Sequence, residues 1–115
     1  MAPKRAMGAL EDLVMEFVWG SAEPVTPADV HQAVAPELAY TTVMTILTRL
    51  WQKDLLDRER QGRAYCYSAV QSEAAHRAAQ MQDTLEVSGD RMAVLSSFVE
   101  TLGSADAKAL KKLLK

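Results

Sequence analysis

Residues 40–55 have two chemically different sides when the segment is wound as an α-helix at about 100° per residue. The polar side has short hydroxyl groups and one arginine, whereas Glu and Lys usually cover a solvated helix face. We call this polar side the threonine face; it comprises Thr41, Thr42, Thr45, Thr48, Arg49 and Gln52. The opposite side is expected to pack on a core; it comprises Tyr40, Val43, Met44, Ile46, Leu47, Leu50 and Trp51.

The threonine face suits close approach to a surface rich in hydrogen-bond acceptors and methyl groups, and the major groove of DNA is such a surface. The threonines would contact phosphates or thymine methyl groups, and the arginine would pair with a guanine or a phosphate. The side chains predicted to contact DNA are Thr41, Thr42, Thr45 and Arg49. Thr48 and Gln52 lie farther along and are expected in solvent. The alternative is that this face docks another protein.

Charge is distributed unevenly along the 115 residues, although the net charge is only −2. Residues 6–40 contain six acids and no Lys or Arg, whereas residues 41–70 contain five bases against three acids. Positive charge is therefore concentrated around the threonine face, which favours a localised site for a polyanion.

Two further helices are predicted before the threonine face. The apolar period predicts the first over residues 9–19. The second begins with Thr26 as N-cap, Pro27 as first helical residue and Asp29 near the positive helix end, and it ends before Pro36.

After residue 55 the pattern changes to alternation, which predicts one β-hairpin with its turn at Gln61-Gly62. The hairpin has a cationic tip that is expected to contact phosphates, formed by Arg58, Arg60 and Arg63. The alternative is a solvated hairpin in which nearby acids balance these charges. Tyr65 and Tyr67 are expected to be core residues beneath the hairpin, and Trp19 and Trp51 to serve in packing.

Three helices followed by a hairpin is the order of a winged helix-turn-helix. We therefore predict a mainly α fold with a small β-hairpin, made of a winged-helix DNA-binding head at residues 1–70 and a helical dimerisation region at residues 71–115. In that region Ser72 and Ser104 are expected to cap helices, with a break at residues 88–90. Its predicted dimer contacts are Leu95, Phe98, Val99, Leu102, Leu110, Leu113 and Leu114.

The sequence gives no support for catalysis, a metal site or a cofactor. His31, Cys66 and His76 lie far apart without ligand spacing, and no nucleophile or phosphate-binding motif occurs. No apolar run approaches the roughly 20 residues that span a bilayer, and a single cysteine suits a reducing compartment. A cytoplasmic protein without membrane insertion is expected.

Four motifs resemble the BlaI/MecI/CopY repressors (penicillinase repressors) across about residues 8–114: G-A-L-E-D-L-V-M-E-F-V-W, A-Y-T-T-V-M-T-I-L-T-R-L, G-R-A-Y-C-Y and S-S-F-V-E-T-L. The resemblance implies a homodimeric transcriptional repressor that binds an inverted-repeat operator, often with TACA/TGTA half-sites. By the second motif, Thr41, Thr42, Thr45 and Arg49 fall on recognition-helix positions.

The resemblance also bears on regulation. In antibiotic-responsive members, a membrane sensor with a metalloprotease domain detects β-lactam, and the repressor is then cut before a Phe that aligns with Phe98. Ser97 precedes it here, where the best-known members have Asn. The C-x-C pairs of copper-responsive members are absent from this sequence, which argues against direct copper sensing. The competing hypothesis is a winged-helix protein-interaction module that does not read DNA.

Overall fold

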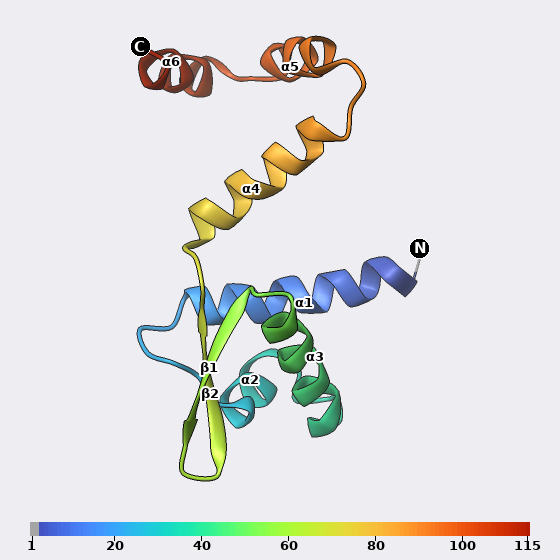
Figure 1. The fold of residues 1–115 in the computed structure, drawn as a ribbon, viewed down its shortest axis with the longest axis vertical. Coiled ribbons are helices and arrows are strands. Elements are labelled where there is room, and N and C mark those ends of the chain that lie inside the picture. The colour runs from blue at the N-terminus through green and yellow to red at the C-terminus, as the bar shows by residue number, and fades with distance from the viewer. Residues whose placement is uncertain (1–2) are drawn as a thin grey trace. The chain divides into compact units, whose positions relative to one another are not determined.

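The computed structural model describes residues 3–115 and forms two compact units, one extending through Ala75 and one beginning at His76 (Figure 1). The first unit contains the elements α1 (Pro3–Trp19), α2 (Pro27–Val34), α3 (Tyr40–Gln52), β1 (Leu56–Gln61) and β2 (Ala64–Ala69). The predicted class, mainly α with a small β-hairpin, is confirmed. The expected functional division at residue 70 stays a prediction.

One hydrophobic core holds the first unit together. Val14 and Val18 of α1 meet Val30 of α2 and the apolar side of α3, and the strands add Leu56 and Tyr67. The apolar period of α1 places these side chains on the inner face of the helix. The helix begins at Pro3, earlier than the expected residue 9.

The start of α2 is fixed by a capping box. Thr26 Oγ1 accepts a hydrogen bond from the Asp29 backbone N–H at 3.1 Å, and the Asp29 carboxylate accepts one from the Thr26 N–H, also at 3.1 Å. Pro27 follows the cap and is buried. The predicted N-cap is thus confirmed, and it sets the direction in which the chain enters the helix-turn-helix.

The third helix ends at Gln52, so its predicted extension to residue 55 is wrong. Asp54 adopts a left-handed φ of 64°, and the N–H groups of Asp54 and Leu55 donate to the Trp51 and Leu50 carbonyls. This pair of bonds is a Schellman motif, which closes a helix with a left-handed residue that is usually glycine. Leu55 fits the apolar period because it packs on the core from just outside the helix.

The strands β1 and β2 pair antiparallel from Leu56–Ala69 to Gln61–Ala64. The turn is therefore Gly62-Arg63, one residue beyond the expected Gln61-Gly62. Gly62 has a φ of 64°, which glycine adopts without a steric penalty.

The base of the hairpin is tied to the connection between α1 and α2. The N–H of Val25 donates to the Tyr67 carbonyl at 2.9 Å, and the N–H of Tyr67 donates to the Val25 carbonyl at 2.8 Å. This bridge adds a third short strand segment at Val25. Beyond Tyr67 toward the tip, the hairpin has only two strands.

Three helices follow the hairpin: α4 (Glu73–Glu86), α5 (Arg91–Glu100) and α6 (Ser104–Leu113). The second unit contains most of α4 and all of α5 and α6. Ser72 Oγ accepts from the Ala75 N–H at 3.1 Å, so the predicted cap of α4 is confirmed. Asp90 caps α5 after the predicted break. The expected Ser104 cap is wrong, because Gly103 is the N-cap of α6 and Ser104 is its first helical residue. None of these three helices buries a side chain.

Candidate nucleic-acid interface

The threonine face of α3 is presented to solvent, while the opposite side of the helix is buried. Val43, Ile46, Leu47 and Leu50 are in the core. The four side chains predicted to contact DNA are exposed; they are Thr41, Thr42, Thr45 and Arg49.

A shallow depression of about 290 Å³ lies along this helix face. It is lined by Met44, Thr45, Thr48, Arg49 and Gln52. Thr48 is half-buried within it, so its expected position in open solvent is only partly correct. A hollow of this kind can receive a small group that projects from a partner surface, such as a base edge or a methyl group.

The hydroxyl of Thr45 is already engaged within its own helix. Its Oγ1 donates to the Thr41 carbonyl at 2.9 Å. The hydroxyl hydrogen is thereby used, so the oxygen remains an acceptor and the methyl group remains available. Thr45 is thus suited to accept from a base amino group or to touch a thymine methyl, and less suited to donate to a phosphate.

Two side chains assigned to the buried side of α3 are in fact exposed. Tyr40 is 45% exposed and Met44 is 38% exposed. Met44 lies at the border of the apolar arc, and Tyr40 is the first residue of α3, so the 100° period does not decide between core and solvent for either side chain. Met44 therefore adds an apolar side chain to the candidate interface that sequence reasoning missed.

Arg49 is the cation of the threonine face, and no carboxylate pairs with it in the described part of the chain. No acidic residue occurs in α3, and no ion pair or hydrogen bond holds the Arg49 side chain within the described part of the chain. The neighbouring Lys53 is different, because its Nζ lies 3.1 Å from Glu11 Oε1 of α1. Arg49 is therefore free to meet an anion or a guanine edge.

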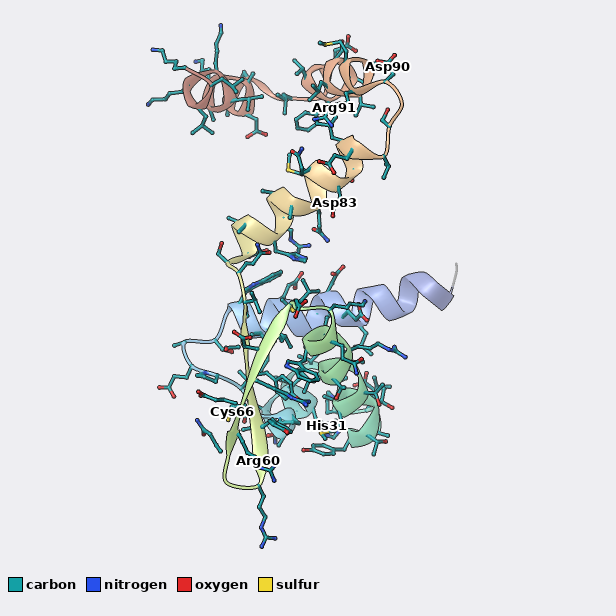
Figure 2. The ribbon with its side chains drawn as sticks, viewed as in Figure 1. His31, Arg60, Cys66, Asp83, Asp90 and Arg91 are labelled. Atoms are coloured by element: carbon teal, nitrogen blue, oxygen red, sulfur yellow. The ribbon has the colours of Figure 1, made fainter. Side chains whose placement is uncertain are left out.

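The three hairpin arginines differ in their surroundings. Arg58 is half-buried, and its guanidinium carbon lies 3.5 Å from the Trp51 ring centroid and 4.1 Å from that of Tyr65. Arg60, which Figure 2 shows near the end of the hairpin, donates from Nε to the Gly62 carbonyl at 3.4 Å. Arg63 is exposed at the turn. The sequence placed all three together, but the exposed cations are Arg60 and Arg63.

The aromatic side chains near the hairpin serve in packing, as predicted. Tyr67 is buried, whereas Tyr65, Trp51 and Trp19 pack on the core while remaining partly exposed. Trp19 also donates from Nε1 to the Gln71 carbonyl at 3.0 Å, which ties the end of α1 to the segment after β2.

The turn between α2 and α3 is held by His31. Its Nε2 lies 2.8 Å from the Leu38 carbonyl, with which it can bond as a donor. Its ring also meets Tyr40 edge-on, with ring centroids 5.7 Å apart. Figure 2 shows His31 beside the start of α3. These contacts hold the turn between α2 and α3. They therefore set the orientation of α3 and of its threonine face.

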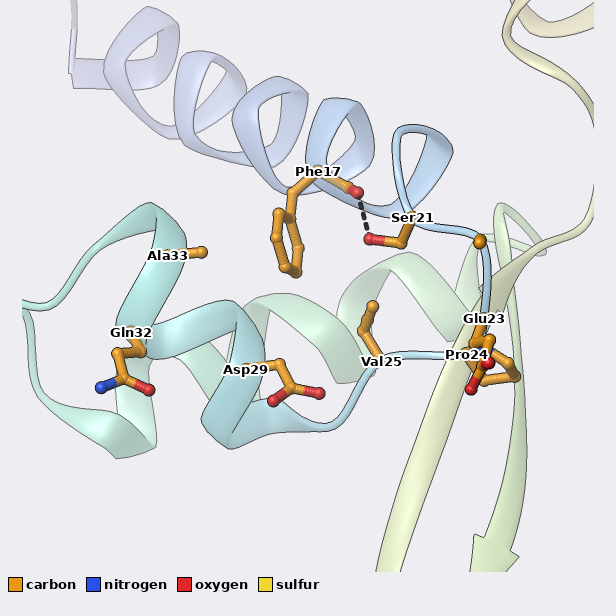
Figure 3. Close-up of a pocket in the computed structure, with 9 residues that line it drawn as sticks. Phe17, Ser21, Glu23, Pro24, Val25, Asp29, Gln32 and Ala33 are labelled. Carbon is orange, nitrogen blue, oxygen red and sulfur yellow. Dashed lines mark hydrogen bonds between the residues drawn. The ribbon is translucent and has the colours of Figure 1, made fainter.

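A second concave region lies between the end of α1 and α2 (Figure 3). This open cleft of about 590 Å³ contains Phe17, Glu23 and Asp29 among its lining residues. Its two carboxylates repel phosphates, so the cleft is unsuited to nucleic acid.

Across residues 3–115, the structure contains no cluster of metal-ligating side chains. No helix in the same range is long and apolar enough to cross a membrane.

The second unit has a large apolar surface. Between α4 and α5 lies a groove of about 370 Å³ with an apolar lining that includes Met81, Leu85, Val94, Leu95 and Phe98. All the side chains predicted for the dimer interface are at least partly exposed; they are Leu95, Phe98, Val99, Leu102, Leu110, Leu113 and Leu114. Ser97 is exposed. Because Ser97 and Phe98 both belong to α5, the peptide bond between them lies inside a helix.

Three helices followed by a β-hairpin, with α2 and α3 as a helix-turn-helix, define the winged-helix class. The penicillinase repressor family model matches residues 7–115 of this chain. The transcriptional regulator BlaI of Mycobacterium tuberculosis is 42% identical over 119 residues, covering 99% of this chain and 86% of the relative. The chain belongs to the penicillinase repressor family and, like it, is a transcriptional regulator rather than an enzyme.

Solved structures give more distant similarities. MepR, a transcription regulator of the Staphylococcus aureus multidrug efflux pump MepA, has a TM-score of 0.49 and 14% identity, covering 91% of this chain and 73% of that one. FabT of Streptococcus pneumoniae, solved in complex with DNA, has a TM-score of 0.41 and 17% identity, covering 99% of this chain and 71% of that one. The family assignment rests on the sequence matches.

Proposed function

We propose that this protein is a homodimeric repressor in the cytoplasm that binds an inverted-repeat operator through α3 and the hairpin. The observation that supports it most is the exposed threonine face with its unopposed Arg49. In this proposal α3 enters the major groove, where threonine methyls and the guanidinium meet base edges. The hairpin tip meets the adjacent phosphates and supplies affinity that does not depend on sequence. Occupation of the promoter then represses transcription.

The dimer in this proposal forms through the second unit. Its helices bury no side chain, and an apolar groove lies between α4 and α5. Apolar surface of this kind on a protein usually marks an interaction site. A second copy of the chain is the partner that also explains two-fold symmetric DNA, because symmetric dimers match inverted repeats.

Release from DNA, in the same proposal, follows an antibiotic-linked or stress-linked signal that reaches the dimerisation region. A membrane sensor protease would cut between Ser97 and Phe98. Both residues are exposed in the single chain, but in the proposed dimer α5 would have to leave the interface and unwind locally before a protease could cut it. Mass analysis of the repressor from cells grown with and without a β-lactam tests this step. An intact chain under induction would refute it.

The central experiment is selection of bound duplexes from a random pool by electrophoretic mobility shift, followed by sequencing. We expect an inverted repeat to be enriched. A matched selection with an Arg49→Ala variant shows which base pairs depend on α3. Failure of the wild-type chain to retain any duplex, at low as well as moderate salt, would favour the protein-interaction module instead.

A further inference from the structure

Arg58 joins three elements of the first unit through its guanidinium group. Trp51 belongs to the last turn of α3, Arg58 to β1 and Tyr65 to β2. The guanidinium carbon is 3.5 Å from the Trp51 ring centroid and 4.1 Å from the Tyr65 ring centroid. These distances lie well inside the roughly 6 Å range of cation–π attraction.

We propose that Arg58 is a positioning residue that sets the hairpin against the recognition helix and does not itself contact DNA. This inference rests on the proposed function and deepens it, because it assigns separate tasks to the hairpin arginines. Arg58 anchors the hairpin on α3. Arg60, whose guanidinium carbon is 5.7 Å from the Tyr65 ring centroid but which does not reach α3, and Arg63 are exposed near the tip and are left to meet phosphates.

The hairpin needs an anchor at this level. The bridge between Val25 and Tyr67 supports β2, and Tyr67 pairs with Arg58 on β1. From the Glu59–Cys66 pair outward the sheet has two strands, and an isolated two-stranded hairpin is only marginally stable in water. The contact between Arg58 and Trp51 lies at the last supported pair, so it can transmit the position of α3 to the tip.

The chemistry of the contact favours arginine over lysine. A guanidinium group is planar and weakly hydrated, so it stacks on aromatic rings more readily than an ammonium group does. No ion pair joins Arg58 to a carboxylate in the described part of the chain. A phosphate contact would be different, because lysine also commonly binds phosphate, as a point charge and without stacking.

The test compares Arg58→Lys and Arg58→Gln with Arg63→Lys and Arg63→Gln in the full-length chain. Arg63 is the matched control, because it is exposed in the same hairpin. Dissociation constants are measured for the selected operator and a random duplex at several salt concentrations, below the melting temperature of every variant. We expect both Arg58 variants to weaken operator binding about 2-fold to 10-fold, whereas lysine at position 63 restores binding.

Double-mutant cycles separate positioning from direct contact. Trp51→Leu should add nothing to Arg58→Gln, and Arg63→Gln should lose most of its effect in the Arg58→Gln background. An Arg58→Lys protein with wild-type affinity, or full additivity of the Arg58 and Arg63 variants, would overturn the inference and indicate a phosphate contact.

A measurement on the free protein keeps this inference separate from the proposed function. Amide hydrogen exchange in residues 59–66 should become faster in Arg58→Gln, while exchange in α1 and α2 stays unchanged. Unaltered exchange in the hairpin would refute the anchoring role. A wild-type chain that binds no duplex would instead refute DNA recognition, whatever the exchange experiment shows.

Discussion

At the scale of single residues, the threonine face has side chains whose hydrogen-bonding options are already partly decided. Thr45 has used its hydroxyl hydrogen within α3, whereas no hydrogen bond or ion pair engages the Arg49 side chain in the described part of the chain. The arginine is therefore expected to provide most of the base discrimination, because a bidentate contact to guanine distinguishes it from the other bases.

We predict that Arg49→Ala weakens binding to the selected operator by about 1–3 kcal/mol. Binding to random duplexes should change much less, because the substitution removes an interaction with a base. Competition titrations with the two kinds of duplex measure the difference. Arg49→Lys is the control, since it keeps the charge without the bidentate geometry. Equal effects on both duplexes would leave Arg49 only a phosphate role.

Asp54 offers a test at the end of α3, because it holds the left-handed position of the Schellman motif with a φ of 64°. For a residue other than glycine, this backbone conformation costs about 1–2 kcal/mol. We predict that Asp54→Gly raises the free energy of unfolding by about 0.5–1 kcal/mol, part of the gain being offset by glycine's greater freedom in the unfolded chain.

Urea denaturation followed by circular dichroism measures this change. The matched control is Gly62→Ala, which puts a side chain at the other position with a φ of 64° and should therefore destabilise the protein. An Asp54→Gly protein no more stable than the wild type would show that Asp54 gains a compensating contact.

At the scale of secondary-structure elements, the hairpin and α3 play different roles in the proposed complex. The hairpin tip offers charge without a fixed recognition geometry. We predict that Arg60→Ala weakens binding to specific and random duplexes alike and reduces the slope of log K against log salt by about 0.9 for each phosphate that the variant no longer neutralises. Titrations between 50 and 200 mM salt, a range typical for such measurements, give the slope. A slope equal to that of the wild type would contradict the contact.

The sequence predicted these elements well where local chemistry decides the structure. The N-cap at Thr26, the core positions of α3 and the alternation of the hairpin all depend on residues within a few positions of each other. The end of α3 was missed, because Leu55 continues the apolar period although Asp54 has already turned the chain.

The candidate site was predicted less completely, because its details depend on distant residues. The exposure of Met44 is decided by how α3 packs on its neighbours. The separation of Arg58 from Arg60 and Arg63 depends on a tryptophan of another element, at a distance that no local period encodes. The sequence predicted a cluster of hairpin arginines, but not which of these arginines stay exposed.

At the scale of the whole molecule, the proposed repressor can read two half-sites with two heads only if the second units associate. Phe98 is 41% exposed and lines the groove between α4 and α5. We predict that Phe98→Glu yields a monomer and weakens operator binding by about 10²- to 10⁴-fold, because the second head loses its effective concentration.

Light scattering after size-exclusion chromatography measures the mass of the Phe98→Glu protein, and a mobility shift measures its affinity. Leu13→Glu is the control, since Leu13 is an exposed apolar residue of α1 in the other unit and should leave the dimer intact. A Phe98→Glu protein that remains dimeric would place the interface elsewhere.

Because α4, α5 and α6 bury no side chain, the stability of the proposed repressor should depend on its concentration in the cell. In the proposed dimer, these helices are shielded only by another copy, so the melting temperature should rise with protein concentration by mass action. Dilution during growth would then lower both operator occupancy and resistance to cellular proteases. The promoter would respond to the number of repressor molecules more steeply than it would to a regulator that works as a single chain.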